Sequence, residues 1–353
     1  MIILISGGAG FVGSSLCLKL KEKYPNYKII AFDNLKRRGA ELNLIDFKKI
    51  NIKFIHGDIR NREDFDEIGE IDVFIEASAE PSVMAGINSN PSYVINNNFV
   101  GSVNCFNYCL KYDAKLIFLS TSRVYPIEKI ENANFIEEAT RFSFDKNQTE
   151  EGISNLGISE KLNLLGPRSF YGTTKLSSEL LIQEYVEFYG LKAAITRFGV
   201  IAGPRQMGKT DQGVVTLWMA KHYWKQPLKY IGYGGLGKQV RDILHIEDLI
   251  SIVEKQIHHT EKFNGKIYNA GGGVDVSASL LEMTSICEKI TGNSIPIGKI
   301  QETRPADLRA YITDNSKIKN EIGWEPQKSV EDIFNDIFNW INQNEKQLEG
   351  ILK

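Results

Sequence analysis

A tyrosine and a lysine four residues apart are the strongest candidates for acid–base chemistry in this sequence. Tyr171 and Lys175 lie in the segment Tyr-Gly-Thr-Thr-Lys, and this spacing puts both side chains on one face of a helix. A phenol ordinarily has a pKa of about 10, so its use as a base near pH 7 needs about 4 kcal/mol of stabilisation of the phenolate. A nearby ammonium group favours the phenolate. The alternative interpretation is a surface tyrosine and lysine on an amphipathic helix.

A glycine-rich segment near the start of the chain could bind phosphate groups. Residues 6–13 read Ser-Gly-Gly-Ala-Gly-Phe-Val-Gly, between a predicted strand and a predicted helix. The spacing fits G-x-G-x-x-G or G-x-x-G-x-x-G. In either register the backbone and the helix N-terminus lie open to a pyrophosphate, although a purely structural turn could look the same. The predicted contacts are Gly7, Gly10, Phe11, Val12 and Gly13.

A carboxylate after the second predicted strand indicates which dinucleotide would bind. Asp33 ends that strand, where a carboxylate accepts hydrogen bonds from the ribose hydroxyls and repels a 2′-phosphate. This favours NAD over NADP, although Arg37 and Arg38 could accommodate the phosphate. Asp58 and Ile59 follow the third predicted strand, where they could reach the adenine or could form only a turn and a helix cap.

Hydroxyl groups follow the fifth predicted strand, in Leu-Ser-Thr-Ser-Arg-Val-Tyr over residues 119–125. Ligands of doubly wound sheets bind beyond the carboxyl ends of the strands. We therefore expect these hydroxyls to face a ligand, and Thr121 could relay a proton between the substrate and Tyr171.

The elements that must position these residues alternate between strands and helices. Such alternation predicts an α/β fold with a Rossmann-type, doubly wound parallel sheet. A helix is expected to begin near Gly172, with Leu176, Leu180 and Phe188 pointing inward. The predicted strands are residues 2–6, 28–33, 52–56, 72–77, 115–120 and 192–198.

The second half of the sequence predicts a smaller, discontinuous α/β lobe that binds the substrate. We expect residues 1–198 to form the dinucleotide-binding domain, with a return segment at about 238–262. Residues 199–237 and 263–353 would form the second lobe, and the polar residues 126–168 an inserted loop near a cleft between the two.

Composition excludes several classes of protein. With 42% apolar and 24% charged residues among 353, the sequence is that of a globular protein. A net charge of −2 gives no general reason to expect a nucleic-acid or membrane partner. The four cysteines show no metal-ligand spacing and favour reduced thiols in a cytoplasmic protein. No stretch approaches the roughly 18 apolar residues of a membrane helix.

Together these motifs resemble the extended short-chain dehydrogenase/reductases that modify nucleotide sugars. The resemblance is carried by the glycine loop with Asp33, by residues 120–125, by Tyr171 with Lys175, and by Gly-Lys-Gln-Val-Arg-Asp-Ile-Leu-His-Ile-Glu-Asp at 237–248. Within that group, residues 32–40, 206–213 and 304–307 most resemble the CDP-paratose (CDP-tyvelose) 2-epimerases.

The resemblance implies an NAD-dependent isomerase of carbohydrate biosynthesis, such as that of lipopolysaccharide, with a nucleoside-diphosphate sugar as substrate and no metal. The implied catalytic residues are Thr121, Tyr171 and Lys175. With the patterns above, the cofactor residues are Gly7, Gly10, Phe11, Val12, Gly13, Asp33, Asn34, Asp58, Ile59, Ser78, Ala79, Asn98, Tyr171 and Lys175. The implied substrate residues are Thr121, Ser122, Arg123, Gln206, Gln212, Arg241, Arg304 and Asp307. Asn98 would support the backbone of the site, and Arg241 would hold the diphosphate.

The mechanistic hypothesis is transient oxidation of the sugar. Tyr171, as phenolate, takes the hydroxyl proton while hydride passes to NAD, and after the keto sugar turns, hydride returns to its opposite face. A UDP-sugar 4-epimerase remains the main alternative. A 4,6-dehydratase carries an Asp-Glu pair where this sequence has Ser122 and Arg123, so it is disfavoured. A non-catalytic relative that binds NAD or RNA would be expected to lack the tyrosine or the lysine.

Two features concern the pocket and the assembly. Pro126 replaces the glycine that is usual after Val-Tyr in relatives, and the insertion at residues 126–168 is longer than in many of them. Because both features could change the sugar pocket, they put the identity of the sugar in question. Relatives commonly dimerise by pairing the helices after Asn98 and Tyr171 into a four-helix bundle, and a homodimer or homotetramer built through such a bundle is expected for this chain.

Overall fold

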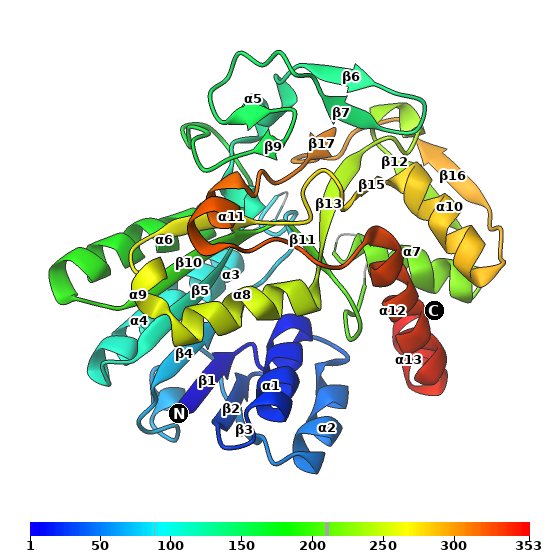
Figure 1. The fold of residues 1–353 in the computed structure, drawn as a ribbon. Helices are drawn as coiled ribbons and strands as arrows, with labels where there is room; N and C mark the ends of the chain where they lie inside the picture. Colours follow the sequence, from blue (N-terminus) through cyan, green and yellow to red (C-terminus); the bar gives the residue numbers. More distant parts are fainter. Residues whose placement is uncertain (88, 209–211) are drawn as a thin grey trace. The chain divides into compact units, whose positions relative to one another are not determined.

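The chain forms two compact units, each assembled from three separate segments (Figure 1). The computed structural model describes residues 1–87, 89–208 and 212–353. The first unit comprises Met1–Thr121, Phe170–Arg197 and Ile250–Ile267. The second comprises Ser122–Ser169, Phe198–Leu249 and Tyr268–Lys353, which is somewhat more than half of the chain.

The first unit is built on a seven-stranded sheet with the order β14-β10-β5-β4-β1-β2-β3 (Figure 1). β1 pairs in parallel with β2 and β4, β2 with β3, and β4 with β5. The order from β3 to β10 is that of a doubly wound Rossmann sheet, so the predicted fold class is confirmed. The strands are β1 (Ile2–Ser6), β2 (Lys28–Asp33), β3 (Lys53–His56), β4 (Val73–Glu76), β5 (Lys115–Thr121), β10 (Ala193–Phe198) and β14 (Ile267–Ala270).

The strands read as continuous apolar runs because both faces of the sheet are covered. Ile3, Leu4 and Ile5 of β1 are fully buried, and so are Phe74 and Ile75 of β4. Such runs are typical of parallel sheets between helical layers. All six predicted strands are present to within one residue at either end.

Helices connect the strands of the first unit. α1 packs against β1 and β2, while α4 and α6 pack against each other and against β5. The helices are α1 (Phe11–Lys23), α2 (Asn43–Lys49), α3 (Ser92–Ile95), α4 (Gly101–Lys111), α6 (Phe170–Tyr189), α8 (Ile246–His258) and α9 (Thr260–Phe263). Short 3₁₀ turns are η1 (Ala40–Leu42) and η2 (Glu63–Phe65), and η3 (Asn96–Val100) is a π-helical turn.

The orientation predicted for two residues of α6 is wrong. Leu180 and Phe188 are 56% and 73% exposed, whereas Leu176 is half-buried. The face of α6 that meets the core instead presents Ser178, Glu179 and Ile182. Polar side chains paired with other buried groups occupy the inner face, so apolar periodicity alone identified the wrong side.

The second unit is built on small sheets. β13 pairs in parallel with β11 and β17 and antiparallel with β15, and β12 pairs in parallel with β16. β6 with β7 and β8 with β9 form two antiparallel hairpins. The strands are β6 (Phe135–Glu137), β7 (Phe142–Phe144), β8 (Ile153–Ser154), β9 (Gly157–Ile158), β11 (Val200–Ala202), β12 (Leu228–Ile231), β13 (Val240–His245), β15 (Ser277–Ser279), β16 (Ile297–Ile300) and β17 (Ala310–Tyr311).

Capped helices pack beside these sheets. α10 and α12 each begin with a capping box, Ser279 with Glu282 and Ser329 with Asp332, and both pack against α7. The helices are α5 (Ile127–Glu131), α7 (Val214–Tyr223), α10 (Leu280–Thr291), α11 (Ser316–Ile322), α12 (Val330–Gln343) and α13 (Glu345–Leu352). The turns are η4 (Ser122–Val124) and η5 (Tyr233–Gly235).

The two units divide the chain differently from the expected domains in two places. Residues 126–168 belong to the second unit, where Arg141 pairs with Glu282 and the main chain of Phe142 bonds to Lys238. The return segment expected at 238–262 joins the first unit only from Ile250 onward. β13, which begins that segment, forms its ladders with strands of the second unit.

Within the described parts of the chain, no helix has the length and apolarity needed to cross a bilayer. All four cysteines are buried free thiols.

Candidate active site

The glycine loop between β1 and α1 has no room for side chains. Gly7 has φ of +63°, and a Cβ atom on it would lie 2.8 Å from the carbonyl oxygen of Ala77. A Cβ atom on Gly13 would lie 2.1 Å from the carbonyl oxygen of Gly7. The loop is closed by a bond from the Gly10 amide to that same carbonyl, at 3.0 Å. Only glycine satisfies these positions, which is why the pattern appears in the sequence.

The start of α1 presents its amides without a side-chain cap. Gly10 is the N-cap residue and the first turn contains no acidic residue. Phe11, Val12 and Gly13 begin the helix, so their N–H groups lack partners within it. A pyrophosphate would meet these amides and the positive end of the helix dipole. The loop and helix therefore fit a dinucleotide.

Asp33 lies beside the loop at the end of β2. Its carboxylate accepts hydrogen bonds from the amides of Ala9, at 3.1 Å, and Leu35, at 2.7 Å. Burial raises the pKa of Asp33 above its usual range, and these backbone bonds act in the opposite direction. The fold thus fixes a carboxylate next to the phosphate-binding turn, where ribose hydroxyls of a dinucleotide lie in such sheets.

Two residues predicted to line the adenine and ribose are linked to each other. Asn34 donates a hydrogen bond of 2.9 Å to Asp58, and Arg60 binds the same carboxylate at 2.6 Å. Burial would raise the pKa of Asp58, but the bonds from Arg60 and Asn34 outweigh it and lower the pKa to about 2. Ile59 is buried, and its carbonyl accepts a bond from Asn104 at 2.8 Å.

A chain of polar contacts connects the predicted catalytic lysine to the glycine loop. The Lys175 ammonium lies 3.3 Å from the carboxylate of Glu76, at the end of β4. Ser78 donates a bond of 2.9 Å to Glu76, and its hydroxyl lies 3.0 Å from that of Ser6, next to Gly7. Lys175 therefore lies at the carboxyl ends of the neighbouring strands β1 and β4, which form the switch point of the sheet.

Tyr171 lies at the start of α6, and Thr121 lies at the end of β5. Tyr171 is half-buried in the first turn of α6, one turn before Lys175, and its carbonyl accepts a bond from Thr174. Thr121 is buried at the end of β5. The fold thereby fixes the hydroxyl of Thr121 at a strand end, and it places the phenol and the amine on successive turns of one helix.

A buried ion pair joins β5, α6 and β10. Glu179 receives a bond from Ser120, the residue before Thr121, and pairs with Arg197 at 2.6 Å. Both charged side chains are almost completely buried. The pair fixes α6 against the strand that carries Thr121.

Asn98 holds the chain that follows β4. Its side chain accepts a bond of 2.7 Å from the amide of Glu80 and donates one of 3.0 Å to the same residue's carbonyl. This clamp sets the backbone directly after Ser78 and Ala79, both of which are half-buried.

In the second unit, Arg241 and Asp307 form an ion pair of 2.7 Å. Arg241 also donates to the carbonyl of Leu308 at 2.8 Å, and Arg123 donates to that of Ala306 at 3.0 Å. The structure therefore brings together three of the predicted substrate residues. Ser122 is buried in η4, next to Arg123.

The remaining predicted substrate residues also lie in the second unit. Gln206 donates to the carbonyl of Ile201 and accepts from Thr216, so its amide braces the loop after β11. Gln212 and Arg304 are half-buried, and the carbonyl of Arg304 accepts a bond from the amide of Asp307. Of the resembling segment 206–213, residues 209–211, which include Asp211, lie outside the described residues.

Sequence reasoning missed the two buried carboxylates, Glu76 and Glu179. The available signal was a charged residue ending the apolar strand Val-Phe-Ile-Glu, because an acid in such a strand is rarely buried without a partner. The identity of that partner depends on tertiary pairing between β4 and α6.

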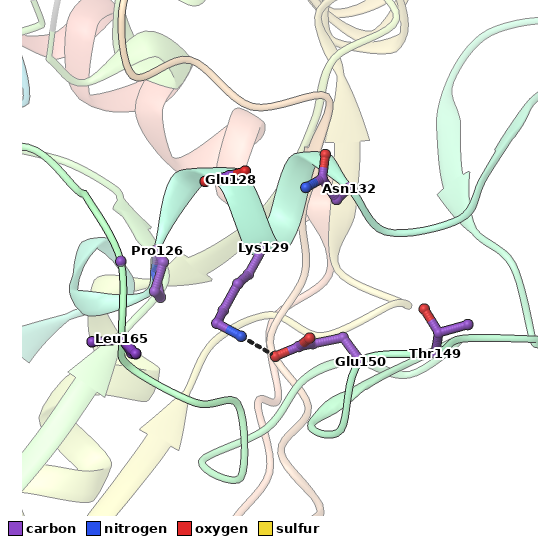
Figure 2. A pocket seen from close by; sticks show the side chains of 8 residues that line it. Pro126, Glu128, Lys129, Asn132, Thr149, Glu150 and Leu165 are labelled. Carbon is purple, nitrogen blue, oxygen red and sulfur yellow. Dashed lines mark hydrogen bonds and ion pairs between the residues drawn. The ribbon is translucent and has the colours of Figure 1, made fainter.

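A pocket of about 300 Å³ in the second unit contains none of the predicted site residues (Figure 2). Lys129 points across it to an ion pair with Glu150 (Figure 2). Because Glu150 already pairs with this ammonium group, we assign no ligand to the pocket. Its lining residues are Pro126, Glu128, Lys129, Asn132, Thr149, Glu150, Leu165 and Gly166. In residues 1–87, 89–208 and 212–353, no cluster of acidic, histidine or cysteine side chains suits a metal ion.

Comparison with known proteins defines the class to which this site belongs. Residues 3–271 match the NAD dependent epimerase/dehydratase family. The chain belongs to this family, an extended short-chain dehydrogenase/reductase family, and it is an NAD-dependent enzyme of the nucleotide-sugar epimerase type. The predictions of family, enzyme class and NAD cofactor are confirmed.

Individual relatives match the chain over nearly its whole length. CDP-paratose 2-epimerase of Salmonella typhi is 31% identical over 350 residues, which cover 96% of this chain and 99% of that protein. The crystal structure of UDP-glucose 4-epimerase with UDP-glucose from Thermotoga maritima is 25% identical, with a TM-score of 0.77 over 98% of this chain and all of that one. That of dTDP-glucose 4,6-dehydratase with NAD from Bacillus anthracis is 25% identical, with a TM-score of 0.76 over 99% of both chains.

Proposed function

We propose that this protein inverts one carbon of a nucleoside-diphosphate sugar, and that the sugar is similar to CDP-paratose, inverted at C2. The observation that carries the proposal is the placement of Lys175, one turn after Tyr171, at the switch point beside the glycine loop. The near full-length similarity to a CDP-paratose 2-epimerase supports the choice of sugar.

The residues of the first unit supply binding and proton transfer. The loop amides hold the pyrophosphate of NAD, and Asp33 accepts hydrogen bonds from its ribose. NAD, when bound, supplies a reversible hydride acceptor. Tyr171 as phenolate takes the proton of a sugar hydroxyl and later returns it, and the Lys175 ammonium favours the phenolate. Thr121 relays the proton between the sugar and Tyr171.

Inversion requires a firm hold on one part of the substrate while the sugar turns. Arg241 and Arg304 are charged groups suited to a diphosphate, and a planar guanidinium binds phosphate oxygens in pairs. In the structure Arg241 donates to Asp307 and to the carbonyls of Val240 and Leu308, so its guanidinium is held in one position. A grip of this kind leaves the sugar ring free to present either face.

A UDP-sugar 4-epimerase is the second candidate, because a solved 4-epimerase holding UDP-glucose shares the fold. A 4,6-dehydratase is less well supported. Elimination of water needs further acid–base groups, and the residues after Thr121 are Ser122 and Arg123 instead of two acids.

Incubation with CDP-paratose and with UDP-glucose, followed by proton NMR of the sugars, tests the proposal. Inversion at C2 of CDP-paratose, with UDP-glucose untouched, is the expected result. Inversion at C4 of UDP-glucose with CDP-paratose unchanged would establish the second candidate. If neither sugar changes while NAD is bound, the substrate assignment fails.

Exposed apolar residues on the helices of the first unit support a proposal about the assembly. Leu180, Phe188 and Tyr189 of α6 are 56%, 73% and 68% exposed, and Ile95 and Val100 near α4 are 37% and 44% exposed. Exposed large apolar side chains on a helix favour association with another surface. The proposed assembly is a homodimer in which α4 and α6 of two copies form a four-helix bundle.

A further inference from the structure

Glu76 is a buried carboxylate to which neither the motifs nor the family resemblance gives a role. Its side chain is completely buried at the end of β4, and that of Lys175 is 3% exposed. Their charged atoms lie 3.3 Å apart. Ser78 donates a second bond to the same carboxylate at 2.9 Å, so both oxygens of Glu76 are bound.

A buried ammonium group is unfavourable unless an opposite charge lies close to it. Desolvation favours the neutral amine, and an opposite charge within about 4–6 Å favours the ammonium. The ammonium also lies 4.1 Å from the ring centre of Phe118 on β5, which attracts a cation more weakly than a carboxylate does. Glu76 is therefore the carboxylate that pairs with the buried Lys175 side chain.

The other ionisable groups around Lys175 do not replace this carboxylate. From α4, Cys105 faces the pair as a neutral thiol, because burial raises its pKa well above the usual range. On α6 itself, Tyr171 precedes Lys175, and Glu179 follows it. The charge of Glu179 is matched by Arg197 of β10, which binds both of its oxygens at 2.6–3.1 Å.

We propose that Glu76 is a positioning residue for the reaction: it keeps Lys175 charged and in place, so that the ammonium is available to favour the phenolate of Tyr171. The inference rests on the proposed function, since it concerns the same tyrosine and lysine. The alternative is a buried pair that contributes only to folding.

The first test is the pH dependence of kcat and KM for Glu76→Gln, with CDP-paratose, or with UDP-glucose if that is the sugar converted. Without the carboxylate, the buried Lys175 side chain loses its oppositely charged partner. The alkaline limb of kcat should move to lower pH by at least about one unit, with KM changed less than about threefold. Glu76→Asp, which keeps the charge, should restore the limb. Glu254→Gln, which removes the partner of Lys23 on α1, should leave it unmoved.

An alkaline limb that stays in place in Glu76→Gln overturns the proposal, and so does a change confined to KM. If Glu76→Gln does not fold, Glu76→Asp decides the question. In Glu76→Asp the side chain is shorter by one methylene, so the carboxylate holds Lys175 less well. The variant should have a lower kcat with the alkaline limb of its pH profile in place, and an unaltered kcat counts against the proposal.

The second test needs no substrate and therefore separates this inference from the proposed function. Denaturant unfolding of wild type, Glu76→Gln, Lys175→Met and the double variant forms a cycle. Glu76→Gln should lower the unfolding midpoint when Lys175 is present, but should raise it in the Lys175→Met background, where it removes a buried carboxylate without a charged partner. Equal losses in both backgrounds would show that the pair is not coupled. An inactive wild type with a coupled pair would defeat the proposed function alone.

Discussion

The guanidinium of Arg241 lies 2.7 Å from the carboxylate of Asp307, 66 residues further along the chain. Arg241 is held from β13 and also donates to the carbonyls of Val240 and Leu308. Its head group is thus fixed before any substrate arrives. A preformed guanidinium of this kind binds a diphosphate at little cost in side-chain entropy.

Arg241→Gln should therefore weaken substrate binding more than turnover. Hydrogen bonds to charged groups contribute about 1.5–3 kcal/mol, so KM for the nucleotide sugar should rise about 10- to 100-fold, with a smaller change in kcat. Steady-state kinetics measures both. Lys238→Gln, which removes a cation of the same unit paired with Glu137, serves as the control and should leave KM unaltered. A normal KM for Arg241→Gln would contradict the assignment.

Gly13→Ala should abolish NAD binding without unfolding the chain. The added methyl group would lie 2.1 Å from the carbonyl oxygen of Gly7, so the loop must move away from the start of α1. Calorimetric titration with NAD measures the loss. Gly350→Ala, where a Cβ atom meets nothing within 4 Å, should bind NAD as wild type does. Equal affinity in the two variants would show that the loop does not hold the cofactor.

Asp242 should make stability depend on pH. Its side chain is fully buried, and burial raises its pKa to about 6 from 3.8, against bonds from Thr313 and Gly273. A carboxyl group whose pKa is raised by folding stabilises the folded chain while protonated. That contribution is complete below about pH 4 and is lost as pH rises through about 6.

Asp242→Asn removes this titration. Relative to wild type, the variant should gain on the order of 3 kcal/mol in unfolding free energy between pH 4 and pH 7. Urea unfolding at both pH values measures the difference. If the unfolding free energies of wild type and Asp242→Asn depend on pH in the same way, folding does not raise the pKa of Asp242 and the prediction is wrong.

The exposed face of α6 should control the oligomeric state. Replacing Leu180 and Phe188 together by serine removes two large apolar side chains from the proposed interface, and sedimentation should show monomers where wild type forms dimers. Leu165→Ser, at an 81% exposed leucine of the second unit, should leave the dimer intact. A monomeric wild type, or a dimeric double variant, would disprove the interface.

The sequence predicted the sheet well because its signals are local. The strands of a parallel sheet are apolar throughout, and the glycine loop needs residues without Cβ atoms, so both features appear as short patterns. The spacing of Tyr171 and Lys175 likewise requires only a helix.

Features that depend on distant residues could not be predicted. Glu76 and Lys175 are 99 residues apart, and only the packing of α6 on the sheet makes them a pair. Apolar periodicity in α6 could not distinguish a core face from an exposed one, so Leu180 and Phe188 were placed wrongly. The contacts that hold residues 126–168 in the second unit, such as Arg141 with Glu282, also join segments far apart in sequence.

The proposed mechanism depends most directly on Tyr171 acting as the base. Tyr171→Phe keeps the ring and removes only the hydroxyl, so the variant should fold and retain bound NAD. Loss of general base catalysis should lower kcat about 100-fold or more, measured with the nucleotide sugar that wild type converts. Near-normal turnover by Tyr171→Phe, with NAD bound, would contradict the role of this residue and with it the proposed mechanism.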